Sequence, residues 1–226
     1  MDMQRHFDQD LSILPEKLLT MASHAESAVN RGVKALVQRD YDLAVQVKND
    51  DDILDRLEIE VDEQAVGLLA KAPLASDLRL VAVAMKISQN LERVGDEAAK
   101  VAKRARALSQ EPPVKVVVDL PRIATLALAM LKAALDSFVN NDAAAARAVI
   151  PRDAEVDRLN KEIRRQLIGF MTEHPDTIAR CLDLLTAAKC LERIADHATN
   201  IAEDVVYLCE ARDIRHSGKA KSTPNP

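Results

Sequence analysis

Residues 91–96 read Leu-Glu-Arg-Val-Gly-Asp, and residues 191–196 repeat the pattern as Leu-Glu-Arg-Ile-Ala-Asp, 100 positions later. Upstream of each copy, residues 55–57 and 157–159 both read Asp-Arg-Leu, at an offset of 102. The two-residue difference falls in the turn between the matched segments, where changes of length are tolerated. Two copies of one unit predict a duplicated bundle rather than a solenoid array.

The composition of the chain is typical of long helices packed by aliphatic side chains. Hydrophobic residues make up 48% of the 226 residues, but aromatic residues make up only 2%, which does not suit the core of a sheet. Through residues 91–96 the apolar positions recur at alternating steps of four and three, which is the spacing of a bundle seam. These positions are Leu80, Ala84, Ile87, Leu91, Val94, Ala98 and Val101. We therefore expect an all-α fold of two tandem, pseudo-symmetric three-helix bundles.

Capping residues and prolines divide the chain into six expected helices. Asp40, Asp119 and Asp142 are predicted to cap the second, fourth and fifth helix, and Ser76 or Asp77 the third. The expected helices span about 5–37, 40–71, 76–108, 119–139, 142–172 and 177–211. We expect a first bundle over 5–110, a linker over 111–118, a second bundle over 119–212 and a disordered tail over 213–226.

Charge and hydropathy exclude several classes of partner. The net charge of -5 leaves no broad basic surface of the kind that nucleic acid binding requires. The longest apolar runs span six residues, whereas a membrane helix needs about 20, so we expect membrane contact only through partners. Residues 1–10 lack the apolar segment of a secretory signal, and Cys181, Cys190 and Cys209 show no CxxC spacing. Together these features favour a cytoplasmic protein with reduced thiols.

Four acidic pairs with i, i+4 spacing place two carboxylates each on one face of a helix. They are Asp51/Asp55, Glu92/Asp96, Asp153/Asp157 and Glu192/Asp196. In an antiparallel hairpin, residues at equal height share one numerical midpoint. The first two pairs share the midpoint 73.5 and the last two share 174.5, each in a predicted turn. Each hairpin should therefore gather four carboxylates about 18 residues, or roughly 28 Å, from its turn.

The seam phase predicts that both four-acid clusters lie at or near the surface. Leu91 and Val94 occupy seam positions, so Glu92 and Asp96 fall on the outer side of their helix. Clustered carboxylates repel one another unless something neutralises them. One interpretation is a divalent or trivalent metal ion, with all-oxygen ligands favouring Mg, Mn or Fe over Zn. The other is neutralisation by adjacent arginines, which are Arg56, Arg93, Arg158 and Arg193.

The segments 92–96 and 192–196 resemble the paired E(D)xxxD motifs of the PhoU family, and residues 73–79 and 50–55 resemble its turn and second helix. The resemblance covers about 5–212. It implies two three-helix bundles, surface metal clusters at these motifs and a cytoplasmic regulator of phosphate uptake. It also implies partners, namely the ATPase subunit of a phosphate ABC transporter and a sensor histidine kinase, with the phosphate-starvation response kept off when phosphate is plentiful. A homodimer is expected.

What the resemblance implies about metal carries over first to Glu92, Asp96, Glu192 and Asp196, with Fe, Mn, Mg or Zn as candidate ions. The second rank consists of Asp51, Asp55, Asp153 and Asp157. No enzyme activity is expected, because the chain has no glycine-rich phosphate loop and no nucleophilic constellation.

Two alternatives stay open at this stage. A metal-storage or di-metal carboxylate bundle would pair Glu with Glu-x-x-His motifs inside the bundle, and no such motif occurs in the sequence. A purely structural adaptor would use the acidic patches to attract basic partner surfaces without any metal.

Overall fold

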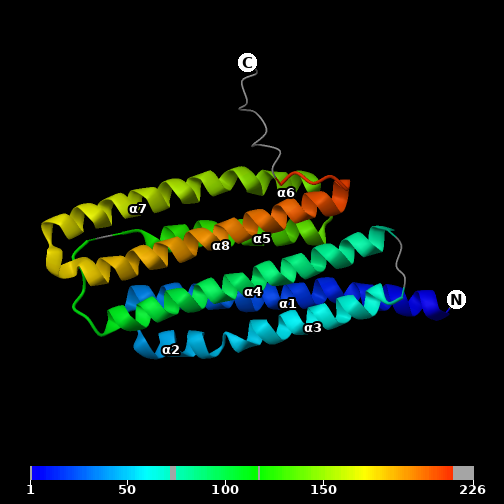
Figure 1. Ribbon diagram of the computed structural model, residues 1–226, viewed down its shortest axis with the longest axis horizontal. Helices are drawn as coiled ribbons and strands as arrows, with labels where there is room; N and C mark the ends of the chain where they lie inside the picture. Colours follow the sequence, from blue (N-terminus) through cyan, green and yellow to red (C-terminus); the bar gives the residue numbers. More distant parts are fainter. Residues whose placement is uncertain (1, 72–74, 117, 216–226) are drawn as a thin grey trace, which may run out of the picture.

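A computed structural model describes residues 2–71, 75–116 and 118–215, with side chains from Asp10 onward. The described residues form helices and no strands, which confirms the predicted all-α class. Figure 1 shows two stacked bundles, with α4 and α8 in contact at the middle of the molecule. The helices α3 and α7 lie at opposite edges, away from that contact.

The two bundles repeat one order of helices. The first contains α1 (Asp2–Gln38), α2 (Tyr41–Asn49), α3 (Asp52–Leu69) and α4 (Ala75–Ser109). The second contains α5 (Leu120–Val139), α6 (Ala143–Val149), the 3-10 turn η1 (Ile150–Arg152), α7 (Asp153–Glu173), the 3-10 turn η2 (Pro175–Thr177) and α8 (Ile178–Glu210). The described residues between α4 and α5 are not helical. Pro73, in the predicted turn between α3 and α4, lies outside the described residues.

Three of the four predicted caps are present; the prediction that Ser76 or Asp77 caps the third helix is wrong, because α4 begins at Ala75 and both residues lie inside it. The side chain of Asp40 accepts a hydrogen bond from the backbone N–H of Leu43, and Asp119 accepts one from Arg122. Asp142 accepts two, from the backbone N–H groups of Ala144 and Ala145. Each cap satisfies donors that the first turn of a helix leaves free, so these local signals fix where the helices begin.

The prediction of unbroken helices over 40–71 and 142–172 is wrong. The first is divided into α2 and α3 around Asp50 and Asp51, and the second into α6, η1 and α7. Pro151 lacks a backbone N–H and so favours the 3-10 turn. At the first break, the backbone N–H groups of Ile53 and Leu54 donate hydrogen bonds to the carbonyl oxygens of Asp50 and Asp51, three residues back. Both interruptions fall at the first acid of a predicted pair, Asp51 or Asp153.

Aliphatic side chains fill the core, as the seam pattern predicted. Ile87, Leu91, Leu191 and Ile194 are fully buried, and most of their neighbours on α4 and α8 are Ala or Val. These small Ala and Val side chains let α4 and α8 approach neighbouring helices closely. Cys181 and Cys190 are buried free thiols and Cys209 is an exposed one, in agreement with the prediction of reduced cysteines.

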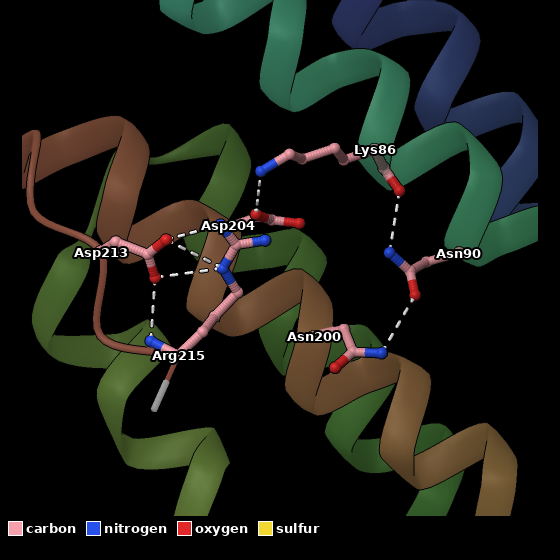
Figure 2. A network of polar contacts seen from close by, with 6 residues as sticks. All are labelled: Lys86, Asn90, Asn200, Asp204, Asp213 and Arg215. Atoms are coloured by element: carbon pink, nitrogen blue, oxygen red, sulfur yellow. Dashed lines mark hydrogen bonds and ion pairs between the residues drawn. The ribbon is translucent and has the colours of Figure 1, made fainter. Parts of the chain in front are cut away.

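Polar side chains cross the contact between the bundles. Lys86 of α4 binds Asp204 of α8 at 2.9 Å, and Asp204 is only 5% exposed (Figure 2). Arg104 binds Asp183 at 3.0 Å at the other end of the same antiparallel contact. A buried acid that lost its partner would cost far more than an exposed one, so these pairs specify how α4 and α8 are aligned.

The end of the described chain folds back beside this contact. Arg215 pairs with Asp213 (Figure 2), and Ile214 packs partly buried against the core. The remainder of the predicted tail, 216–226, lies outside the described residues. No described helix has both the length and the apolar character needed to cross a membrane.

Candidate metal centres

The structure brings the first four predicted acids together where α3 starts beside α4. Burial raises the pKa of Asp51, and the charges of Asp96, Asp55 and Asp52 raise it further. Burial likewise raises the pKa of Glu92 to about 7, with Asp96, Glu58 and Asp55 adding to the shift. The charges of Asp96 and Asp55 therefore act on both Asp51 and Glu92.

The second set meets in the same way where α7 starts beside α8. Burial raises the pKa of Asp153, followed by the charges of Asp157 and Glu192. Burial also raises the pKa of Asp196 to about 6, and Asp153 and Glu192 are its largest charged contributors. The two repeats thus build two separate four-acid clusters, one in each bundle.

The surface expectation is only partly met. Asp55 is exposed, and most of the other acids in the two clusters are half-buried. Glu192 departs from the expectation, because it is 9% exposed where α7 packs on α8. The seam phase was read from one helix alone, so it gives the direction of the bundle core but not how much of a flanking side chain is covered.

Within the described residues the predicted arginine partners form no ion pair with the clusters, although the charge of Arg93 opposes the rise in the pKa of Glu92. Arg193 reaches across to Glu97 of α4 at 3.3 Å, and Arg158 pairs with Glu155 at 4.0 Å. Among the described residues, lysines make the ion pairs to these acids. They are Lys100 with Asp96 at 3.3 Å, Lys161 with Asp157 at 3.6 Å, and Lys189 with Glu192. Their i, i+3 and i, i+4 spacing was visible in the sequence, but the side chain chosen by each lysine was not.

His197 and Glu97 follow the second acid of each motif and turn away from the clusters. The Nδ1 atom of His197 lies 3.0 Å from Asn90 Oδ1 across the contact between the bundles. Glu97 is buried in the same contact. Neither residue adds a ligand to the carboxylate clusters, so the candidate donors are all oxygen atoms.

The donor set and its electrostatics fit a hard cation. Asp153 Oδ1 is buried without a hydrogen-bond partner, so an unsatisfied acceptor lies inside the second cluster. Across the described part of the chain, no three His, Cys, Asp or Glu side chains already converge as a metal-binding group. A bound ion would therefore have to draw the carboxylates together, and oxygen donors suit Mg, Mn or Fe.

A glycine holds α4 close to the start of α3. A Cβ atom at Gly95 would lie 2.3 Å from Leu54 Cδ1 and 3.7 Å from Asp51 Oδ1. The repeat has Ala195 at the equivalent position, and there the leucine is replaced by the smaller Val156. The two repeats thus exchange volume between the paired positions, one with Gly and Leu and the other with Ala and Val.

The duplicated bundle matches the model of a known protein family. The model of the PhoU domain matches the chain twice, over residues 18–105 and 120–205. The chain belongs to the PhoU family. The two PhoU matches each contain one of the four-acid clusters, and they correspond to the internal repeat.

Individual relatives agree with the family match. A Pseudomonas aeruginosa protein named phosphate-specific transport system accessory protein PhoU homolog is 41% identical over 216 residues, covering 95% of this chain and 89% of its own. A Rhizobium meliloti homologue with the same name is 40% identical over 204 residues, covering 89% of this chain and 86% of its own.

Two crystal structures of PhoU proteins share the fold. PhoU from Pseudomonas aeruginosa superimposes with a TM-score of 0.88 at 41% identity, covering 91% of this chain and all of that one. The phosphate transport system regulatory protein PhoU from Streptococcus pneumoniae gives 0.85 at 27% identity, covering 92% and 99%.

We expect the free energy of unfolding of the metal-free protein to fall as pH rises from about 4 to 7. Folding raises the pKa of Glu92 from its usual 4.5 to about 7 and that of Asp196 from 3.8 to about 6. The folded state therefore binds more protons than the unfolded state in this window, and stability is lost as the protons leave. The expected loss is about 1 kcal/mol for each group, since both carboxylates are partly solvated.

Urea unfolding at successive pH values in the presence of a chelator measures this effect. The double variant Glu92→Gln, Asp196→Asn should show a smaller fall over the same range. An equal fall in both proteins would assign the pH dependence to other groups.

Proposed function

We propose that this chain is a cytoplasmic regulator of phosphate uptake that restrains the phosphate-starvation response when phosphate is plentiful. It would do so by coupling a phosphate ABC transporter, through the ATPase subunit, to a sensor histidine kinase. The family membership and the names of the relatives support the role in phosphate transport. The absence of a catalytic constellation from the sequence supports a regulator rather than an enzyme.

Metal binding at the two carboxylate clusters is the second part of the proposal. Glu92 and Asp96 with Asp51 and Asp55 would hold one ion or cluster of ions, and Glu192 and Asp196 with Asp153 and Asp157 the other. A bound ion supplies positive charge that neutralises the mutual repulsion of the acids. The protein's carboxylates would then tie α3 to α4 and α7 to α8, and present an ordered surface at the edges of the molecule.

The observation that carries this proposal is the doubling of the four-acid cluster in two matches of one family domain. A di-metal enzyme or storage protein fits less well, because each cluster lies between two helices rather than among four. The metal-free adaptor is the remaining alternative. Metal analysis distinguishes the metal-binding protein from the adaptor. The purified wild type should contain more metal than a variant with Glu92, Asp96, Glu192 and Asp196 changed to their amides, and equal contents would favour the adaptor.

A partner experiment tests the regulatory role. The tagged chain, purified from phosphate-replete cells, should recover the transporter's ATPase subunit, the sensor kinase or both. Recovery of neither partner, in extracts where both are shown to be present, would contradict the proposed coupling.

A homodimer is the expected oligomeric state. It should elute in size-exclusion chromatography at about twice the monomer mass.

Deletion of the gene should derepress phosphate-starvation genes in phosphate-rich medium, because the restraint on the kinase is removed. A reporter fused to a phosphate-starvation promoter measures this, with the wild-type gene supplied in trans as the control. Unchanged reporter expression after deletion would contradict the regulatory role.

A further inference from the structure

The two carboxylate clusters are surrounded by different residues, although the repeat predicts equivalent sites. In the first cluster, Asp52 and Glu58 add negative charge within electrostatic reach of Asp51 and Glu92. The equivalent positions in the second repeat are Ala154 and Asn160, which carry no charge. The first cluster therefore gathers six acids where the second gathers four.

The second cluster, which has fewer acids, has more lysines paired with them. In the second cluster Lys189 pairs with Glu192, and Lys161 pairs with Asp157 at 3.6 Å. The equivalent positions in the first repeat are Gln89 and Ile59. The second cluster thus has two lysines bound to its four acids.

Lys100 is the one lysine that the described structure pairs with the first cluster, and it is shared; the charge of Arg93 also acts on Glu92, without an ion pair. It binds Asp96 at 3.3 Å but also Glu97 at 3.1 Å, and Glu97 is buried in the contact between the bundles. Its charge therefore balances an acid outside the cluster as well as one inside. The second repeat has Asn200 at the equivalent position, and that side chain reaches Asn90 across the contact (Figure 2).

Lys189 occupies a central place in the second cluster. Besides its ion pair with Glu192, its charge acts on Asp153 and Asp196. It therefore affects three of the four candidate ligands. The ammonium group partly provides the neutralisation that a metal ion would otherwise supply.

We propose that the two sites are unequal: the first cluster is the tighter metal site, and Lys189 is a built-in cation that a metal ion must displace from the second. This proposal rests on the proposed metal-binding function. It makes occupancy sequential, with the first bundle filled at a lower metal concentration than the second. Lys189 sets the concentration at which the second bundle responds.

Calorimetric titration of the full chain with Mn²⁺ at low ionic strength tests the proposal. The double variant Glu192→Gln, Asp196→Asn leaves the first cluster, and Glu92→Gln, Asp96→Asn leaves the second. The first cluster should bind Mn²⁺ roughly tenfold more tightly than the second, as expected for the difference in nearby charge. High salt should narrow the difference, because it screens these charges.

Exchanging one residue between the repeats then measures the effect of the lysine on Mn²⁺ affinity. Lys189→Gln, added to the protein that keeps the second cluster, should tighten Mn²⁺ binding roughly tenfold. Gln89→Lys, added to the protein that keeps the first cluster, should weaken it by a similar factor, since residue 89 precedes Glu92 as Lys189 precedes Glu192. Both positions are exposed, so the fold should be retained.

Lys132→Gln is the matched control, because it removes an equal charge from an exposed position on α5. It should leave both affinities unchanged. Equal affinities of the two clusters, or a Lys189→Gln affinity within about twofold of its parent, would overturn the inequality while metal binding stands. A wild-type chain that binds no Mn²⁺ would instead overturn the proposed metal function itself.

Discussion

Changing Glu92, Asp96, Glu192 and Asp196 together to their amides is expected to abolish stabilisation by Mn²⁺ while making the metal-free protein more stable. An ion that binds only the folded state, present at 100 times its dissociation constant, stabilises by about 2.7 kcal/mol for each site. The amides cannot supply that binding, so the gain should disappear. The metal-free variant should gain because it lacks the burial of charge, and the mutual repulsion, that raise the pKa of Glu92 and Asp196.

Chemical unfolding with Mn²⁺ and with a chelator measures both effects. A control variant should change four exposed acids outside the clusters to their amides, namely Glu26, Asp42, Asp136 and Glu173. This control matches the change of net charge but should keep the full response to Mn²⁺. A quadruple cluster variant that still responds like the wild type would leave the adaptor without metal as the better interpretation.

Gly95→Ala is expected to destabilise the protein by about 1–2 kcal/mol, even though alanine favours a helix by about 1 kcal/mol. The added Cβ would lie 2.3 Å from Leu54 Cδ1, and Leu54 is buried, so α3 and α4 must move apart or Leu54 must adopt a poorer rotamer. Because Asp51 Oδ1 lies 3.7 Å from the same point, the start of α3 should shift as well. Urea unfolding measures the stability, and a Mn²⁺ titration measures the effect on the first cluster.

The second repeat supplies the compensating change. Leu54→Val combined with Gly95→Ala reproduces the Val156–Ala195 pair and should recover most of the lost stability. Gly67→Ala is the control for helix propensity, since a Cβ at that glycine meets no atom within 4 Å and the variant should be more stable. A Gly95→Ala protein as stable as Gly67→Ala would show that the close approach is not limiting.

Several features of the candidate site depended on packing that sequence patterns do not record. The shared midpoints brought the acids of each hairpin together, because an antiparallel pair of helices fixes relative height. They did not anticipate the burial of Glu192, which is only 9% exposed. They also did not anticipate that Arg193 binds Glu97 in the other bundle, which leaves the lysines to pair with the acids.

The two helix interruptions differ in how far the sequence alone could predict them. Pro151 was a visible signal for the break before α7, yet no proline accompanies the break at Asp50 and Asp51. The first interruption is a choice among near-equal local conformations. Both α2 and α3 pack on α1 and α4 at this point.

The sequence by itself determined the all-α class, the duplication, the capped helix starts and the heights of the acidic pairs. These depend on residues three, four or seven positions apart, or on the repeat offset, and such spacing can be read from the chain. Only the tertiary structure decided which acids are covered, which lysine each acid pairs with, and how closely Gly95 approaches Leu54. Those outcomes depend on side chains from different helices competing for one volume and one charge, and no single helix contains that information.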